Sequence, residues 1–222
     1  MDLRTRGEST SMEPNSPKRG EFFWLRPDTT RPGRGHGVVF ENVKELLTPP
    51  RLILRPEGGG FPHLASVPRL VYSPKKGDPP EDLEGGMSGY WLVSERLKLV
   101  FEQVDPDGFK FVECDYRAPD GSALSPYYLC EVARVLDAVD EGASTMQVLV
   151  SDEYPTGKIY DLTGGASLAF RKDVIGQAHV FHTPFSGSLT FCDRHLRNAV
   201  WSAGIGGPDA SRGLRFKDAA DI

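Results

Sequence analysis

Two segments of the chain carry the spacing of an amphipathic helix. Over residues 94–104, apolar side chains recur at intervals of three and four positions, which places them on one face of a helix. Ser94 is suited to cap the first turn, and residues 105–108, with a proline at the second position, are expected to end the helix. A second helix is expected over residues 193–203, with Asp193 as its cap and a glycine after its last turn.

Shorter runs of apolar and alternating residues predict strands around these helices. The segments 109–116 and 127–136 are joined by a turn sequence in which Pro119 presets φ and Gly121 supplies a positive φ. Further strands are expected at residues 146–150, 158–162, 167–170, 178–182, 188–191 and 214–216. Because these strands follow one another without long helices between them, the sequence predicts one α+β domain, with a largely antiparallel sheet and a few packed helices.

The segments outside this pattern are expected to lie at the surface or outside the fold. Residues 1–20 have almost no large apolar side chain, so we expect a disordered tail, followed by a folded domain over residues 21–222. Residues 49–89 are rich in proline and glycine, with short apolar islands at 52–54 and 70–72. We therefore expect surface loops there and edge strands at most.

Net charge and cysteine content narrow the class of protein. The chain has 222 residues and a formal net charge of −5, which argues against a nucleic-acid binder. Cys114, Cys130 and Cys192 lie among apolar residues without a CxxC pair, so we expect reduced thiols that pack as small apolar side chains. The sequence has neither the apolar core of a secretory signal nor a segment long enough to span a bilayer, so we expect a cytoplasmic protein without membrane contact.

Acidic residues are concentrated in one segment. Residues 1–56 carry ten Lys or Arg and seven Asp or Glu, a net of +3, which leaves −8 for the remainder. From residue 137 to residue 153 there are five acids and no base, namely Asp137, Asp140, Glu141, Asp152 and Glu153. Either these acids form an ordinary solvated face with acidic loops, or they form a surface that attracts a basic partner.

Histidine and cysteine spacing gives little support to a metal site. His179 and His182 are three positions apart, which on a strand places them on opposite faces. Cys192 and His195 have a spacing that suits a metal site on a strand-to-helix turn, but no second pair of ligands accompanies them. A buried thiol beside a surface histidine also explains this pair, and we expect no bound metal.

Glu113 and Asp115 are the one candidate catalytic pair. They share a face of a predicted strand, and two such carboxylates can hold Mg²⁺ for phosphoryl chemistry, with Arg117 and Asp107 as candidate additions. The two acids equally suit the solvated face of a half-buried strand, or an ion pair with Arg134 across the hairpin. An Mg²⁺-dependent hydrolase that uses Glu113 and Asp115 therefore remains the alternative function.

The rest of the sequence matches no catalytic or cofactor-binding motif. Its glycine pairs and triplets are not followed by the Lys-Ser/Thr of a phosphate loop, and there is no GxSxG sequence. We therefore assign no catalytic residue and expect no cofactor. The sequence favours a protein that acts through a complementary surface and not as an enzyme.

Several stretches together share the pattern of one known family. They are residues 47–55 (LTPPRLILR), 81–102 (EDLEGGMSGYWLVSERLKLVFE), 111–117 (FVECDYR), 162–204 and 213–222 (GLRFKDAADI). An aromatic-led S-E-x-L helix, a late F-x-D helix and a C-terminal G-L-R-F strand carry the pattern. Over residues 21–222 the chain resembles a bacterial immunity protein family of polymorphic-toxin systems, immunity family eleven, of the kin-discrimination type.

The resemblance implies a protein encoded beside a toxin that bacteria deliver into neighbours or kin. Such a protein binds the toxin in the cytoplasm and blocks it, which gives self-protection. The toxins paired with the family include nucleases, and the family has no established catalytic residues. The implied partner is a cognate toxin protein, with no direct contact to nucleic acid.

The acidic segment is the expected toxin-binding surface. Nuclease toxins approach polyanionic substrates and tend to carry basic surfaces, so an acidic inhibitor associates with them quickly. The expected contact residues are Asp137, Asp140, Glu141, Asp152, Glu153 and Tyr154, of which Tyr154, in an acidic turn, is the expected aromatic anchor. Trp91 and Trp201 are further candidates for anchors, although we expect both to pack in the core.

Overall fold

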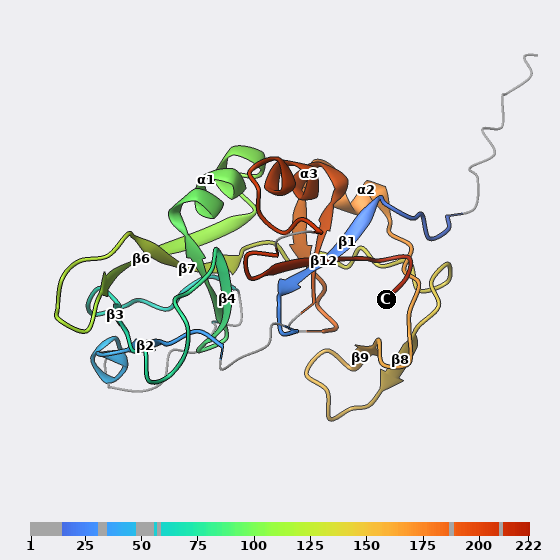
Figure 1. Ribbon diagram of the computed structural model, residues 1–222. Coiled ribbons are helices and arrows are strands. Elements are labelled where there is room, and N and C mark those ends of the chain that lie inside the picture. The colour runs from blue at the N-terminus through green and yellow to red at the C-terminus, as the bar shows by residue number, and fades with distance from the viewer. Residues whose placement is uncertain (1–14, 31–34, 48–55, 57–58, 187–188, 209–210) are drawn as a thin grey trace, which may run out of the picture.

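The described part of the chain folds into two larger sheets, a separate hairpin and a few helices (Figure 1). A computed structural model describes residues 15–30, 35–47, 56, 59–186, 189–208 and 211–222. The prediction of largely antiparallel strands with a few helices is confirmed, because every pair among the described strands except one is antiparallel. The strands form two larger sheets instead of one, and a single domain remains a prediction.

The strands have the following order and bounds. The first sheet has the order β10 (Val180–His182), β11 (Thr190–Asp193), β1 (Phe22–Pro27) and β12 (Leu214–Asp218). The second has the order β2 (Val38–Phe40), β3 (Arg69–Tyr72), β6 (Phe109–Arg117), β7 (Tyr127–Val132), β5 (Tyr90–Ser94) and β4 (Leu83–Met87), with β3 and β6 parallel. The hairpin consists of β8 (Gln147–Val150) and β9 (Lys158–Asp161).

Helix α1 (Glu95–Val104) forms where the apolar spacing predicts a helix. The Ser94 hydroxyl accepts a hydrogen bond of 3.3 Å from the backbone N–H of Leu97, which is the predicted N-cap. Leu97 and Phe101 are fully buried. The helix ends at Val104, with Asp105 as its C-cap, because the proline that follows Asp105 disfavours the helical conformation there.

Helix α3 (Arg194–Ser202) confirms the second predicted helix. The Asp193 carboxylate accepts a hydrogen bond of 2.9 Å from the backbone N–H of Leu196, and Gly204 follows the helix with a φ of +74°. Leu196 and Val200 form its buried face. A third, short helix, α2 (Lys172–Ile175), was not predicted.

The side-by-side packing of α1 and α3 joins the two sheets (Figure 1). The buried cluster beneath them takes residues from both helices, from β1 of the first sheet and from β5 and β7 of the second. Two further clusters form elsewhere. One is built on the aromatic residues Phe22, Phe170, Phe181 and Phe191, and the other centres on Leu70, Tyr90 and Leu129.

A buried carboxylate holds the seam between the sheets. Asp105 accepts hydrogen bonds from both terminal nitrogens of Arg134, at 2.6 and 2.9 Å, and from the backbone N–H of His179, at 2.8 Å. Gly108 allows this approach, since a Cβ atom there would lie 2.6 Å from Val180 and 2.7 Å from the carboxylate carbon. Burial raises the pKa of Asp105, but its hydrogen bonds outweigh this effect and hold the pKa below its usual value.

Several predicted strands differ from those that form. β3 is not an edge strand, because β2 covers one side of it and β6 the other. The predicted strand 127–136 ends at Val132, and residues 134–136 instead exchange backbone hydrogen bonds with His182, at 2.8 and 2.9 Å. The predicted strand 167–170 makes only isolated bridges, and the apolar island 52–54 lies outside the described residues.

The predicted tail 1–20 is described only from residue 15 onward. The side-chain amide of Asn15 donates to Asp140 and to the carbonyl of Phe170, both at 3.0 Å. The backbone N–H of Gly20 donates to Asp218 at 2.6 Å. A domain boundary at residue 20 and disorder before it remain predictions. In the described ranges, no helix combines the length and apolarity needed to cross a membrane.

The three cysteines are buried free thiols, as predicted. Burial raises the pKa of Cys114 to about 12, and it also raises the pKa of Cys130 and Cys192 above their ordinary value. Since the thiolate is the reactive form, folding protects these residues from alkylation.

We expect the native protein to react with iodoacetamide at pH 8 at least about a thousandfold more slowly than the urea-unfolded chain, because reaction requires opening of the core. Mass spectrometry of the labelled peptides measures this. Rapid labelling of any of the three cysteines in the native protein would contradict the expectation.

We expect Asp105→Asn to lower the free energy of unfolding at neutral pH by about 3 kcal/mol, because the change leaves Arg134 without its buried partner. The exposed Asp107→Asn is the matched control and should change stability by less than about 0.5 kcal/mol. Urea titrations measure both.

The pH dependence has a defined sign. The folded-state pKa of Asp105 is depressed, so its contribution to stability is present above the unfolded pKa and is lost as the pH falls through the folded pKa. Asp105→Asn should therefore lose less stability on acidification than the native chain. An identical acid profile would show that Asp105 contributes nothing.

Candidate functional site

The predicted acidic segment divides between two parts of the fold. Asp137, Asp140 and Glu141 lie in the connection between β7 and β8, and Asp152 and Glu153 lie in the turn between β8 and β9. The connection is held by backbone hydrogen bonds to residues 167–171, whereas the turn stands at the end of the hairpin.

The three acids of the connection have internal partners. Asp137 forms an ion pair of 3.1 Å with Arg171, and Asp140 accepts the hydrogen bond from Asn15. Glu141 pairs with Lys158 and accepts a hydrogen bond of 2.7 Å from the Tyr160 hydroxyl. The bonds from Lys158 and Tyr160 lower the pKa of Glu141, and the bond from Asn15 lowers that of Asp140. These carboxylates therefore stabilise the fold as well as adding negative charge.

The two acids of the turn, in contrast, form no ion pair with a described residue. Asp152 and Glu153 are exposed, and no described cation forms an ion pair with either. The turn is held by backbone hydrogen bonds from Ser151 to Gly157 at 3.1 Å and from Gly157 to Tyr154 at 2.9 Å. Tyr154 is half-buried. That these residues contact a toxin remains a prediction.

The tryptophans differ in exposure. Trp91 is half-buried and packs against the cluster beneath the helices, as expected. The prediction that Trp201 packs in the core is wrong, because its side chain is 37% exposed. Its indole N–H donates to the carbonyl of Gly206 at 2.7 Å, and the Arg197 guanidinium lies 4.3 Å from its ring. This bond ties the indole to the loop after α3 and keeps it at the surface.

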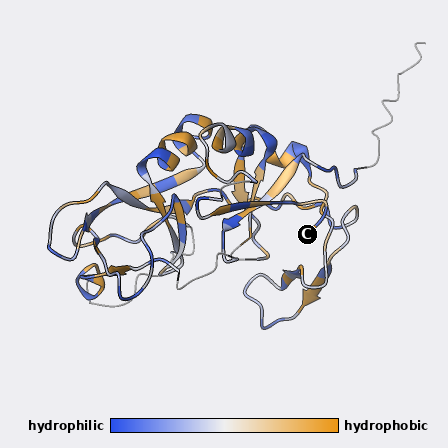
Figure 2. Ribbon diagram, in the orientation of Figure 1, coloured by the Kyte–Doolittle hydropathy of each residue, from blue (hydrophilic) through white to orange (hydrophobic). Residues whose placement is uncertain are grey.

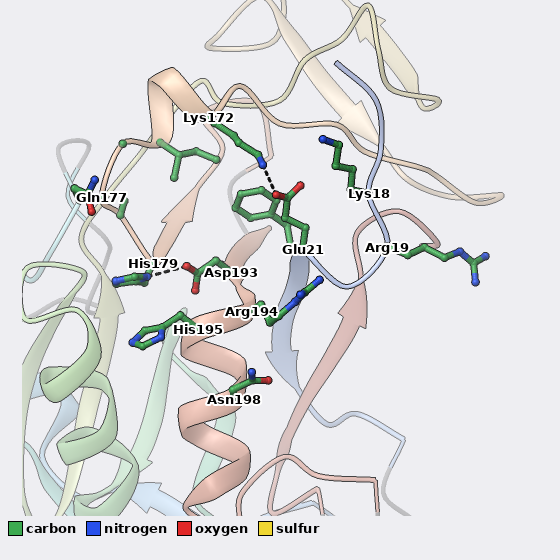
Figure 3. Close-up of a pocket in the computed structure, with 14 residues that line it drawn as sticks. Lys18, Arg19, Glu21, Lys172, Gln177, His179, Asp193, Arg194, His195 and Asn198 are labelled. Carbon is green, nitrogen blue, oxygen red and sulfur yellow. Dashed lines mark hydrogen bonds and ion pairs between the residues drawn. The ribbon is translucent and has the colours of Figure 1, made fainter. Parts of the chain in front are cut away.

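A surface pocket of about 770 Å³ opens where the N-terminal segment crosses α2 and the start of α3 (Figure 3). Cationic side chains surround it, namely Lys18, Arg19, Lys172 and Arg194. Lys172 pairs with Glu21, and Arg19 pairs with Asp221 at 3.1 Å. Much of this positive charge is therefore neutralised within the protein.

Two histidines lie on one wall of the pocket (Figure 3). The His179 ring contacts the Asp193 carboxylate at 2.8 Å, and the His195 ring lies 4.8 Å from the His179 ring. Asp193 also caps α3, so this carboxylate orients the first histidine and the helix together. Each oxygen of Asp193 therefore has a partner, and the arrangement positions structural elements.

The remaining candidate metal ligands do not meet. His182 is buried and contacts the Thr190 hydroxyl at 3.1 Å, away from His179. Cys192 is fully buried in the core, whereas His195 is exposed. Within the described residues, no three or more His, Cys, Asp or Glu side chains gather as a metal site.

Glu113 and Asp115 lie on the outer part of β6. Asp115 forms an ion pair of 3.0 Å with Arg117, two positions along the strand. The predicted pairing with Arg134 is wrong, because Arg134 is taken by Asp105. Glu113 and Asp115 line a shallow hollow with Val67 and Leu124.

The residues that the sequence did not single out are Leu149 and Val150 of β8. They are 39% and 78% exposed, although the neighbouring Val148 packs against the aromatic cluster. The signal in the sequence for their exposure was an uncharged strand followed directly by an acidic turn. The apolar run considered alone predicts burial instead.

Comparison with known proteins identifies the family of the chain. Among individually curated proteins, none matches its sequence. The model of the immunity protein family Imm11 matches residues 21–221, which is nearly the whole chain. The chain therefore belongs to the Imm11 immunity protein family.

Proposed function

We propose that this chain is an immunity protein that binds a cognate bacterial toxin in the cytoplasm and neutralises it, so that the producing cell is protected. The observation that carries the proposal is the Imm11 match over residues 21–221. The chain acts by forming a stoichiometric complex, without catalysing a reaction. A nuclease fits as the toxin, since an enzyme that approaches nucleic acid tends to have a basic surface, and this chain carries a net charge of −5.

We propose that the toxin contacts the acidic segment, through Asp137, Asp140, Glu141, Asp152, Glu153 and Tyr154. Within this set, Asp152 and Glu153 supply the charge that is free to attract a partner, because the other three acids already have internal partners. Tyr154 lies in the same turn and offers an aromatic ring beside the two acids.

Co-expression tests the function. With the adjacent toxin gene under an inducible promoter, this chain should restore growth of the host and co-purify with the toxin in a fixed ratio. The matched control is the same plasmid with an early stop codon in this gene. Growth arrest that no adjacent toxin candidate relieves in the presence of this chain would overturn the proposal.

Neutralising the free acids should slow association. We expect Asp152→Asn with Glu153→Gln to lower the association rate on the order of threefold at low salt, because the two charges steer a basic partner, and we expect the difference to shrink above 0.5 M salt, where the Debye length is short. Stopped-flow mixing of the purified proteins measures the rate.

The control carries the same change in charge at a distance from the turn. Asp107→Asn with Glu113→Gln replaces two exposed acids near and on β6, and should leave the rate close to that of the native chain. Equal rates for both double variants at low salt would remove the turn from the contact surface, while leaving the function intact.

A further inference from the structure

The β8–β9 hairpin presents apolar side chains to solvent. It lies apart from α1 and α3 (Figure 1). β8 carries three apolar residues, whereas β9 begins and ends with a charged residue, and both colours appear in the hairpin in Figure 2. Val148 and Tyr160 pair across the strands and face the aromatic cluster. Leu149 is 39% exposed and Val150 is 78% exposed. The hairpin therefore has one face anchored in the protein and an apolar outer part without cover among the described residues.

The register of the hairpin fixes which backbone groups point outward. The N–H of Ser151 donates to the carbonyl of Gly157 across the turn. In an antiparallel pair, hydrogen-bonded and non-hydrogen-bonded positions alternate, so Leu149 bonds to Ile159, and Val148 and Val150 direct their N–H and C=O groups away from β9. The backbone groups of Val148 and Val150 form the outer edge of β8.

The two edges of the hairpin differ. On the β9 side, the outward N–H of Tyr160 donates to the carbonyl of Phe185 at 2.9 Å, so this edge is covered. On the β8 side, the described chain supplies no backbone hydrogen bond to Val148 or Val150. β8 also has neither a charge nor a proline within Gln147–Val150, which are the usual protections of an exposed edge.

Charge decides what pairs with this edge. Asp152 and Glu153 follow β8 directly and have no ion-pair partner in the described residues. A second copy of the chain would bring its own acidic turn and a net charge of −5, and repulsion would oppose the pairing. A strand flanked by Lys or Arg would meet these acids favourably.

We propose that β8 is the strand to which the toxin adds an edge strand of its own. The main-chain groups of the toxin strand pair with those of Val148 and Val150, and its apolar side chains cover Leu149 and Val150. Basic residues that flank the toxin strand contact Asp152 and Glu153. In this mode, main-chain hydrogen bonds supply affinity and the alternating side chains supply specificity. The inference rests on the proposed function and specifies how that function is carried out.

Amide hydrogen exchange tests the pairing directly. The native chain is measured by NMR alone and in complex with the product of the adjacent toxin gene. The amides of Val148 and Val150 should exchange at least about tenfold more slowly in the complex, while that of Leu149, already bonded within the hairpin, should change little. A complex in which the Val148 and Val150 amides keep their free-state rates would overturn the inference.

A backbone substitution gives a second test. Val150→Pro removes an outward N–H at an edge position that tolerates proline, and it should weaken toxin binding at least about tenfold while the thermal midpoint is kept. Val150→Thr keeps the N–H and the branched shape, and it should bind within about threefold of the native chain. Leu99→Lys places a charge at another exposed apolar position, on α1, and should bind as the native chain does.

The outcomes separate this inference from the proposed function. If the native chain binds the toxin and Val150→Pro binds equally well, strand addition is wrong and the immunity function stands. Equal loss in Val150→Pro and Val150→Thr would also overturn it, because side-chain burial alone would then explain binding. If sedimentation shows a native dimer that Val150→Pro dissociates without loss of toxin binding, the edge belongs to a second copy. A native chain that binds no adjacent toxin overturns both proposals.

Discussion

The Asp105 carboxylate is the constraint on which the arrangement of the two sheets depends. A buried charge is tolerated only when hydrogen bonds replace its hydration, and Asp105 receives three, two from Arg134 and one from the backbone of His179. These donors belong to the segment after β7 and the segment before β10, and the acceptor follows α1. One side chain therefore fixes where the second sheet ends, where the first begins and where α1 stops.

The hydrogen bonds that start at Asp105 continue through His179 and Asp193 to the first turn of α3. The backbone of His179 is held by Asp105, its ring contacts Asp193, and Asp193 caps the first turn of α3. The two helices over the core are thus joined at their ends by polar contacts as well as by apolar packing. The pocket beside these residues is lined by Asp193 and Glu21, and both carboxylates already have partners within the protein.

The sequence predicted the parts of the fold that depend on local physics. Both longer helices and their caps followed from apolar spacing and from Ser94 and Asp193, since capping involves residues only three positions apart. The interior position of β3 could not be predicted, because it pairs in parallel with a distant part of the sequence, Arg69 lying opposite Asp115 of β6. Arg134 was assigned to the wrong acids for the same reason, since Asp105 and His179 approach it only in the folded chain.

The acidic segment could be predicted from the sequence, but not which of its acids would pair within the fold and which would stay exposed. Composition gives the same charge to Glu141 and Glu153, yet folding supplies Lys158 and Tyr160 to the first and no described cation to the second. The exposure of Val150 was missed because an apolar strand is ordinarily buried, and only the position of the hairpin relative to the sheets decides otherwise.

The attachment of the hairpin separates the residues that stabilise the fold from those of the proposed contact surface. Val148 and Tyr160 hold it to the aromatic cluster, whereas Leu149, Val150 and the turn make no contribution to that cluster. Substitutions on the outer part of the hairpin therefore change the free energy of unfolding little. Substitutions at Asp105 or Arg134 disturb the contact between the two sheets and lower it. In the proposed complex this arrangement favours specificity, because the outer residues of the hairpin can change to match one toxin without altering the fold that presents them.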